Sequence, residues 1–381
     1  MAKHVRKLLN HQRDILSPEA IAGIQEAIAS LRAAIKNKAS KAGLREEMQN
    51  IEIAANKWLI PYPNPGWREN VEVLLVALAV AMGIRTFFLQ PFKIPTGSMQ
   101  PTLFGVTSVN LLQRPEMKIP SGWERVHEWF QGTSYIHITA KSDGELEAVG
   151  RPLRLFIFNL KQTVYVGGHA YTIWFPPDFG APPRGTLMAR ANLQIGEMFH
   201  AGQDIVKLEV SAGDHLFVDR VSYNFRTPKR GEIIVFETKG IPEEERERFN
   251  IPADEFYIKR LVGLGGDRIQ IGNDRHLIVN GQRLDASTPH FEKVLGFNPD
   301  VPAKVNHYSG YVKQPTYLAP YFYEHPGGVV VPKGDFLVMG DNTMDSLDSR
   351  AWGPFPSQYV IGKSFFVYWP LTSRFGWGYH R

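Results

Sequence analysis

The chain has 381 residues, more than the roughly 250 to 300 that one hydrophobic core usually serves, so one or two globular domains with an attached segment are expected. Its 43 Lys and Arg residues exceed its 38 Asp and Glu residues by five, and because this excess is spread along the chain, nucleic-acid binding is not indicated. The chain contains no Cys, which excludes disulfides, thiolate zinc sites and cysteine nucleophiles.

Residues 1–66 are predicted to form a helical hairpin. Ser17 and Pro18 offer an N-cap and a first-turn proline. Two apolar stripes at helical spacing follow, separated by a polar break at 36–43: Ile21, Ile24, Ile28, Leu31 and Ile35, then Leu44, Met48, Ile51, Ala55 and Leu59. The pattern leaves open whether the hairpin packs on itself, forms an oligomer or binds a specific partner.

Residues 67–92 are predicted to form one transmembrane helix. The run Val73–Ile84 is uncharged and mostly apolar, and an Arg85 that snorkels extends it to roughly 20 residues, enough to cross about 30 Å of hydrocarbon. The eleven Lys and Arg residues in the first 70 positions favour an amino terminus in the cytoplasm. We therefore expect a single-pass protein of the inner cell membrane, with everything after about residue 90 outside the cytoplasm.

Residues 93–381 are predicted to form a β-rich extracytoplasmic domain. Short segments rich in β-branched and aromatic residues alternate with Gly and Pro, as at Tyr135–Thr139, Leu153–Phe158, Thr163–Val166, His215–Asp219, Glu232–Phe236 and Ser364–Tyr368. This pattern favours an antiparallel sheet, so the expected fold class is mainly β. Insertions are expected at about 107–205 and 275–333.

A serine lies in a constrained turn shortly after the apolar segment. Pro95 and Gly97 predict a sharp bend, and Pro101 opposes a helix starting at Ser98. The Ser98 hydroxyl is therefore expected to project from the turn. Taken alone, the turn is more typical of a solvated loop serine.

A lysine lies in a predicted strand of bulky residues, Phe256–Gly263. Strand alternation places Tyr257, Lys259 and Leu261 on one face, where the lysine could lose its hydration. Burial favours the neutral amine, which can accept a proton from a serine hydroxyl, and Ser-Lys pairs are a known variant of serine hydrolases. An ordinary surface lysine is the alternative interpretation of this segment alone.

The turn-forming segment at 340–350 completes a combination of motifs. Together with the serine and lysine segments it resembles the type I signal peptidases, membrane-bound serine proteases of the Ser-Lys kind. The resemblance is carried by Ser98–Leu103, Gly213–Arg220, Pro228–Ile233, Tyr257–Arg260 and Gly340–Gly353. It implies a signal peptidase-like fold for the β-rich domain.

The resemblance implies a role for each matched residue. Ser98 would be the nucleophile and Lys259 the general base, working through an acyl-enzyme. Thr96 and the Ser98 backbone N–H would form the oxyanion hole. The supporting residues would be Ser346, hydrogen-bonded to the lysine amine, Asp348 and Arg350 in the wall of the site, and Tyr257 beside the lysine.

The resemblance also implies the partners of the protein. Substrates would be secretory preproteins with A-x-A-like cleavage sites. The protein itself would contact membrane lipid and, transiently, the protein translocation machinery. No metal or organic cofactor is expected, because His residues show no H-E-x-x-H spacing and Cys is absent.

Two other functions stay open from the sequence. One is a catalytically silent, membrane-anchored binding protein, against which the presence of both Ser98 and Lys259 argues. The other is a specialised relative that processes one dedicated secreted substrate, with narrow specificity encoded in the insertion at about 107–205. The preferred cleavage-site residues and the oligomeric state do not follow from the sequence.

Overall fold

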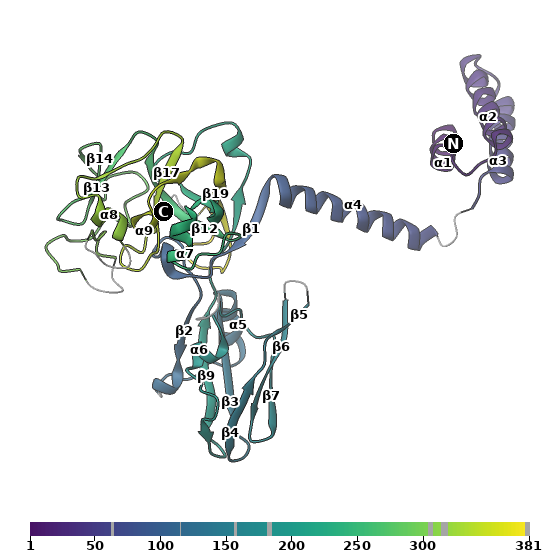
Figure 1. The fold of residues 1–381 in the computed structure, drawn as a ribbon. Coiled ribbons are helices and arrows are strands. Elements are labelled where there is room, and N and C mark those ends of the chain that lie inside the picture. The colour runs from purple at the N-terminus through teal and green to yellow at the C-terminus, as the bar shows by residue number, and fades with distance from the viewer. Residues whose placement is uncertain are drawn as a thin grey trace. The chain divides into compact units, whose positions relative to one another are not determined.

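The computed structural model describes residues 1–61, 65–114, 116–155, 158–180, 185–303, 308–313 and 319–377 (Figure 1). The chain divides into two compact units, Met1–Val80 and Ala81–Arg381.

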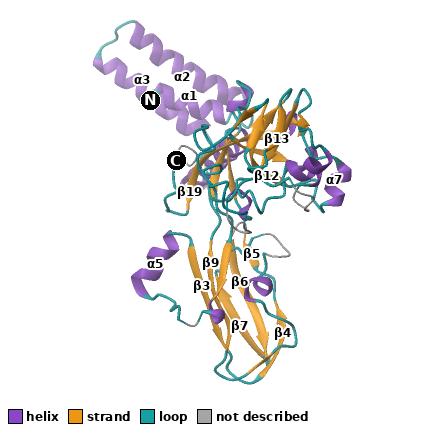
Figure 2. Ribbon diagram, turned by 90° about the vertical axis from the view of Figure 1, so that its left-hand side faces the viewer, coloured by secondary structure: helices purple, strands orange, loops and turns teal. Residues whose placement is uncertain are grey.

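The first unit begins with three helices, α1 (Ala2–His11), α2 (Pro18–Lys36) and α3 (Lys41–Trp58). As predicted, Ser17 caps α2, with its hydroxyl accepting a 3.2 Å hydrogen bond from the Ala20 backbone N–H. The short link between α2 and α3 brings the two helices side by side as a hairpin (Figure 2). Helix α1, which the sequence pattern did not predict, packs against this hairpin.

The core of the three helices draws on all of them. It contains Val5, Leu9, Ile24, Ile28, Leu31 and Ile51. Ile35 and Met48, both predicted to belong to the apolar stripes, are 58% and 43% exposed, so the prediction was wrong for these two. The buried Gln12 side chain bonds both the backbone N–H and the carbonyl of Ile60, which holds the end of α1 against the segment after α3.

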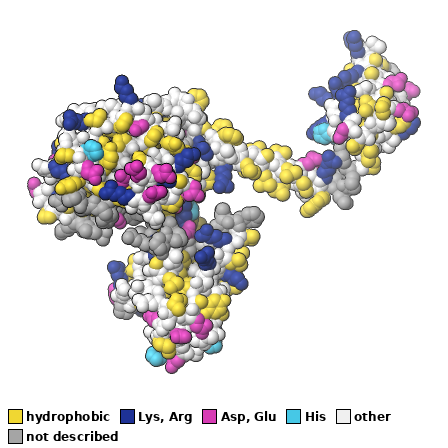
Figure 3. Space-filling model, viewed as in Figure 1, with side chains coloured by type: hydrophobic (Ala, Val, Ile, Leu, Met, Phe, Trp, Pro, Cys, Tyr) yellow, Lys and Arg dark blue, Asp and Glu magenta, His cyan; other side chains and the backbone are white. Residues whose placement is uncertain are grey.

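Helix α4 (Pro65–Phe87) carries the apolar segment. Its residues Gly66–Phe87 are, within the described part of the chain, the only helix long and apolar enough to cross a membrane. Hydrophobic side chains cover its exposed surface (Figure 3). The helix ends at Phe87, whereas the sequence predicted a span to residue 92. Pro91 cannot lie inside a helix without loss of a hydrogen bond, and the residues after 88 pair in a sheet instead.

The second unit is built around an antiparallel sheet, as the predicted fold class requires. Among the described residues seven strands join it, in the spatial order β1-β10-β19-β11-β12-β17-β18. Their bounds are β1 Leu89–Lys93, β10 His215–Asp219, β11 Ile233–Glu237, β12 Phe256–Leu264, β17 Asp335–Met339, β18 Phe355–Pro356 and β19 Val360–Trp369. The mainly β, antiparallel fold is thereby confirmed.

Both faces of this sheet are buried. In β11, Ile233 and Val235 belong to one hydrophobic core, whereas Ile234 and Phe236 belong to the core on the opposite face. A strand covered on both sides has no need for polar residues at alternate positions. This explains why the sequence of β11 is an apolar run without alternation.

A smaller sheet extends the central one. It contains β13 (Arg268–Ile271), β14 (Leu277–Val279), β15 (Gln282–Arg283) and β16 (Val329–Val330). Its core includes Val262 of β12 and Leu337 of β17, so the two sheets share side chains. The short helices of this part are α7 (Glu243–Arg248), α8 (Pro320–Glu324) and α9 (Ser349–Trp352).

The predicted insertion at about 107–205 forms a separate β-lobe, defined here as residues 107–211. Its strands are β2 Thr107–Asn110, β3 Thr133–Thr139, β4 Gly144–Val149, β5 Leu153–Leu155, β6 Phe158–Val166, β7 His169–Trp174, β8 Met198–Phe199 and β9 Asp204–Ser211, and its helices are α5 Gly122–Phe130 and α6 Leu187–Ala191. The lobe has its own core, with Leu146, Val164 and Leu208 fully buried. Of the strand predicted at 153–158, residues 156 and 157 lie outside the described part.

Candidate active site

Ser98 lies in a single 3-10 turn, Gly97–Met99, that follows β1. Ile94 before the turn and Met99 within it are buried in the hydrophobic core, so the turn is held on both sides of the serine. Gly105 packs against the backbone of Thr96, where a Cβ atom would lie 2.1 Å from the Thr96 carbonyl oxygen. Ser98 itself remains partly exposed. The backbone therefore fixes the position of an accessible hydroxyl.

Lys259 reaches this hydroxyl from the middle of β12. Its Nζ lies 2.7 Å from Ser98 Oγ, within hydrogen-bond distance. The lysine is 5% exposed, and its Nζ lies 5.6 Å from the centre of the Tyr257 ring. The structure thus brings together three of the residues singled out in the sequence.

Burial dominates the electrostatics of the amine. It lowers the pKa of Lys259 from 10.5 to about 8, while the Asp348 carboxylate acts to raise the pKa and the Arg350 guanidinium to lower it. Burial also raises the pKa of Tyr257 to about 12, so this phenol stays neutral. An amine with a pKa near 8 is partly neutral in mildly alkaline solution and can then accept a proton.

The loop after β17 holds the serine turn from the other side. The Asn342 backbone N–H donates a 3.0 Å hydrogen bond to the Ser98 carbonyl, and the Asn342 side-chain amide donates a 3.1 Å bond to the Gly97 carbonyl. Gly340 makes this approach possible: a Cβ atom there would lie 2.5 Å from the Ser98 carbonyl oxygen. The loop and the serine turn are therefore interlocked through their backbones.

Asp348 and Arg350 form a fully buried ion pair behind this loop. The Asp348 carboxylate accepts bonds from Arg350 Nε at 2.9 Å and from the Gly340 backbone N–H at 2.8 Å. The guanidinium donates further bonds to the carbonyls of Thr343 and Ser346. Because each polar group has a partner, the pair fixes the loop conformation. Both charges lie close enough to Lys259 to act on the pKa of its amine.

Two other predicted residues make weaker contacts or none. Thr96 Oγ1 lies 3.5 Å from Ser98 Oγ, so the threonine hydroxyl points toward the serine, although it is exposed. The hydrogen bond expected between Ser346 and the lysine amine is not formed. The Ser346 hydroxyl is buried without a hydrogen-bond partner, and it lies against Gly340 instead.

A second buried ion pair was missed by the sequence reasoning. Arg260, the neighbour of the lysine in β12, donates bonds of 2.7 Å and 2.5 Å to the Asp341 carboxylate. It also donates to the Gly231 carbonyl at 2.6 Å. Arg260 and Asp341 each belong to a segment that carries the family resemblance. The sequence around neither residue indicates that the two side chains meet. The sequence also did not predict the role of Asn342, which bonds the carbonyls of Gly97 and Ser98 in the serine turn.

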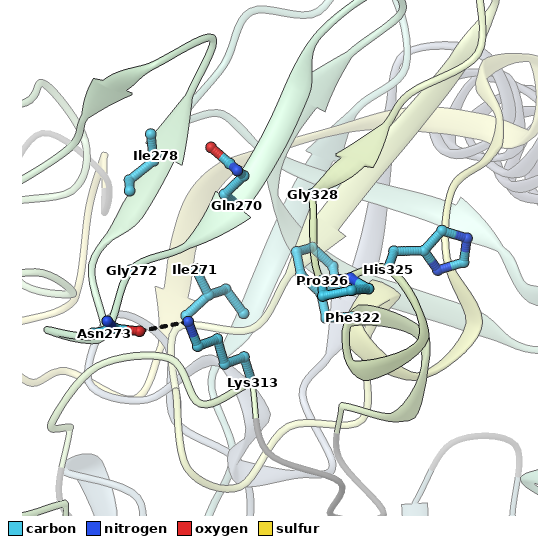
Figure 4. A pocket seen from close by; sticks show the side chains of 10 residues that line it. All are labelled: Gln270, Ile271, Gly272, Asn273, Ile278, Lys313, Phe322, His325, Pro326 and Gly328. Atoms are coloured by element: carbon cyan, nitrogen blue, oxygen red, sulfur yellow. Dashed lines mark hydrogen bonds between the residues drawn. The ribbon is translucent and has the colours of Figure 1, made fainter.

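A pocket of about 270 Å³ lies elsewhere, on the smaller sheet (Figure 4). Asn273, Lys313 and His325 are among its polar lining residues, and the Lys313 amine donates a 2.6 Å bond to the Asn273 side chain. Neither Ser98 nor Lys259 lines it. This pocket is therefore distinct from the Ser98–Lys259 site.

A serine hydroxyl paired with a buried amine is the arrangement of serine hydrolases that use lysine as the base. The family model described as "Signal peptidase, peptidase S26" matches residues 67–112 and 200–369, more than half of the chain. The chain therefore belongs to the signal peptidase family, peptidase S26. The unmatched residues 113–199 fall within the β-lobe.

Several relatives carry signal peptidase names. The chain is 34% identical over 165 residues to signal peptidase I of Leptolyngbya laminosa, covering 43% of this chain and 64% of that protein. It is 30% identical over 198 residues to signal peptidase I of Pseudomonas aeruginosa, covering 46% and 66%. The chain thus spans less than two thirds of these relatives. A solved signal peptidase I from Enterococcus faecalis V583 is 25% identical, with a TM-score of 0.25, over 36% of this chain and 97% of the other.

Proposed function

We propose that this protein is a membrane-anchored serine endopeptidase that removes signal peptides from secretory preproteins. The observation that carries the proposal is the 2.7 Å approach of the buried Lys259 amine to Ser98 Oγ in a chain of the S26 family. Helix α4 would be the anchor, with the helices before it in the cytoplasm and the β-rich unit outside, in the inner cell membrane. Membrane anchoring would confine enzyme and substrate to one surface.

The proposed reaction starts from neutral Lys259. The amine takes the proton of the Ser98 hydroxyl as the oxygen attacks the scissile carbonyl, and the resulting ammonium protonates the leaving amine. The acyl group is then on Ser98 Oγ. Lys259, neutral again, takes a proton from water, which attacks the ester; the ammonium then returns that proton to Ser98 Oγ as the acid is released. Each proton lost by a nucleophile thus passes through one buried amine.

The charge that develops on the scissile carbonyl oxygen needs donors. We assign this role to the Ser98 backbone N–H and the Thr96 hydroxyl, which already points toward Ser98 Oγ. One such donor contributes about 2.7 to 4 kcal/mol of transition-state stabilisation in hydrolases. Thr96→Val should therefore lower kcat roughly 100-fold with little change in KM, whereas Thr96→Ser should retain most activity.

The supporting residues keep the pair in place. The Asp348–Arg350 ion pair holds the 340–350 loop, and Asn342 joins that loop to the serine turn. We assign Ser346 a positioning role, because its buried hydroxyl lies in the loop that Arg350 holds through the Ser346 carbonyl.

The test is cleavage of a preprotein with an A-x-A site by the detergent-solubilised full chain. The parent should cut at that site, and Ser98→Ala and Lys259→Ala should be inactive while folded. Lys333→Ala, which removes an exposed lysine between β16 and β17, is the matched control and should cut like the parent. Equal activity in all four proteins would overturn the assigned mechanism.

The β-lobe gives a reason to consider narrow specificity. Its residues 113–199 lie outside the regions that the family model matches, and it begins only a few residues after the serine turn. A peptidase for one dedicated substrate would cleave that preprotein and leave unrelated preproteins intact. Cleavage of several unrelated preproteins at comparable rates would exclude this form. A folded parent that cleaves none of them would favour a silent binding protein.

A further inference from the structure

The predicted insertion at about 275–333 reaches the serine turn through a short irregular segment. Residues 308–311, here called the strap, lie between β15 and α8 in the chain. The Tyr308 hydroxyl donates a 3.1 Å hydrogen bond to Gln100 Oε1, 208 residues away in the sequence. Gln100 closes the 3-10 turn that holds Ser98, because its backbone N–H donates a 3.1 Å bond to the Gly97 carbonyl. The strap is therefore in direct contact with the end of the serine turn.

The other end of the strap contacts the 340–350 loop. The Tyr311 hydroxyl donates a 3.2 Å hydrogen bond to the Gly340 carbonyl, and the Tyr311 ring lies 5.1 Å from the guanidinium carbon of Arg350. The Tyr311 side chain is fully buried, and a buried phenol hydroxyl needs a partner. The Gly340 N–H already bonds the Asp348 carboxylate, so Tyr311 completes the pairing of both polar backbone groups of this glycine.

The position of the strap is set by the smaller sheet. At the turn between β13 and β14, Arg275 Nε donates a 2.7 Å bond to the Ser309 carbonyl, and the Arg275 carbonyl accepts a 2.9 Å bond from the Tyr311 N–H. Gly310 has a φ of +93°, and a Cβ atom there would overlap the Phe297 ring, so only glycine suits this position. The Tyr311 side chain belongs to the core of the smaller sheet. The strap therefore has supports of its own, separate from the serine turn.

The two tyrosine hydroxyls bond the elements around the reacting groups and not the reacting groups themselves. Each donates to a carbonyl oxygen, one at the end of the serine turn and one in the loop that interlocks with that turn. Loss of either bond leaves both groups in place but removes one tie between the elements that carry them.

We propose that Tyr308 and Tyr311 are positioning residues of the peptidase site. The strap holds the serine turn and the 340–350 loop together, so that Ser98 Oγ stays within reach of the Lys259 amine. A misplacement near 1 Å in an active site costs about 100-fold in rate, and loss of one hydrogen bond displaces the elements less. The inference rests on the proposed function, and it makes the second insertion a part of the site.

Removal of single hydroxyl groups tests the inference with the packing kept. Tyr311→Phe loses the bond to Gly340, and Tyr308→Phe loses the bond to Gln100. Tyr323→Phe, at a 58% exposed tyrosine of α8 in the same insertion, is the matched control. Cleavage of an A-x-A peptide is measured on the detergent-solubilised full chains, at a temperature where circular dichroism shows each variant to be folded.

We expect kcat to fall about tenfold in Tyr311→Phe and about threefold in Tyr308→Phe, where water can replace part of the lost bond. KM should stay within about twofold of the parent, because the substrate does not contact the strap. The pH midpoint near 8 should not move, because neither hydroxyl bonds Lys259. Gln100→Met removes the acceptor of the Tyr308 bond, so the double variant with Tyr308→Phe should be no slower than the slower single variant.

Parent-like kcat in both folded tyrosine variants would overturn the inference. A rise in KM at constant kcat would also overturn it, in favour of a strap that binds the substrate. If Tyr311→Phe does not fold, Tyr308→Phe and the double-variant comparison decide the question, since the Tyr308 side chain is only partly buried.

Amide hydrogen exchange separates the inference from the proposed function, because it needs no substrate. The Asn342 N–H, which bonds the Ser98 carbonyl, should exchange faster in Tyr311→Phe, and the Gln100 N–H should exchange faster in Tyr308→Phe. Tyr323→Phe should leave both rates unchanged. This result in a chain whose parent cleaves no A-x-A peptide would remove the proposed function while supporting the strap as the element that ties the two segments together. Unchanged exchange and unchanged kcat in variants of an active parent would remove only the inference about the strap.

Discussion

Lysine 259 is buried in its charged form only at a cost in folding free energy. Its pKa is lowered from 10.5 to about 8 in the folded chain, so the unfolded chain binds more protons between these two pH values. Stability therefore rises with pH across that window, and the destabilisation is fully present below about pH 8. The same burial keeps the amine neutral at a lower pH, as a base must be. The cost in folding stability and the proposed role of Lys259 therefore have one cause.

The first prediction concerns pH dependence. If neutral Lys259 is the base, kcat/KM should fall about tenfold per pH unit below a midpoint near 8 and level off above it. The measurement is cleavage of an A-x-A peptide by the detergent-solubilised chain over this range. Lys333→Ala should leave the midpoint unchanged. A rate that is flat through pH 8 would show that another group accepts the serine proton.

The second prediction concerns stability. Lys259→Met keeps the length of the side chain and removes the buried charge, so the variant should be inactive but more resistant to heat than the parent below pH 8. The gain is at most about 3 kcal/mol, set by the pKa difference, and should shrink as the pH rises toward 10.5. Thermal unfolding of both proteins at several pH values measures it. A variant less stable than the parent at every pH would mean that the amine is held by favourable contacts that outweigh its burial.

At the scale of elements, the site depends on two backbones that touch. The serine turn and the 340–350 loop meet where Asn342 bonds Ser98, and this approach leaves no room for a side chain at Gly340. A Cβ atom there would lie 2.0 Å from Ser346 Oγ and 2.5 Å from the Ser98 carbonyl. Rotation of Ser346 could relieve the first contact but not the second, which is with backbone.

The third prediction follows from this contact. Gly340→Ala should push the loop away from the serine turn, cost about 1 to 3 kcal/mol of stability and lower kcat at least about 100-fold, because a displacement near 1 Å is enough to misplace the nucleophile. Gly83→Ala, in α4 with open space around it, is the matched control and should be neutral. Activity and circular dichroism are measured on both variants. Full activity of Gly340→Ala would show that the interlock does not position Ser98.

Local signals in the sequence were sufficient for the turns and strands that carry Ser98 and Lys259. Prolines and glycines around Ser98 define a turn whatever the rest of the fold does, and β-branched and aromatic residues define β12. The end of α4 was misjudged because an apolar residue of β1, Phe92, serves a sheet core as well as it would serve a bilayer. Composition alone does not distinguish these two environments.

Contacts between distant segments could not be read from the sequence. Arg260 and Asp341 are 81 residues apart, and only the pairing of β12 with β17 brings their side chains together. For Ser346 the resemblance implied a hydrogen bond that the structure does not contain. Whether that bond forms depends on the position of the Ser346 hydroxyl, which lies against Gly340. Helix α1 was missed because its two core residues, Val5 and Leu9, make too short a stripe to stand out.

At the scale of the whole molecule, the β-lobe is an addition that leaves the central sheet intact. Its base is fixed by Asp214, whose buried carboxylate accepts a 2.8 Å bond from the Phe104 N–H and bonds from the Arg374 guanidinium. The Asp214 carbonyl accepts a 2.9 Å bond from the Ile94 N–H, just before the serine turn. These contacts lie outside the lobe, so they should survive its removal.

The fourth prediction is that the β-lobe can be removed without loss of the chemistry. Asn110 and Leu208 face each other in the pairing of β2 with β9, so an Asn-Gly turn can join them and leave a short hairpin. Removal of the lobe would expose the side chains of Leu208 and Val210, which belong to its core, so both would be replaced by Thr. Among the described residues, removal of the lobe costs β1 one ion pair, between Lys93 and Asp178, which is partly exposed and contributes at most about 1 kcal/mol.

This shortened chain should cleave a short A-x-A peptide within about tenfold of the parent rate, because every contact that holds Ser98 and Lys259 remains. If the shortened chain folds but no longer cleaves the peptide, the β-lobe contributes directly to the active site.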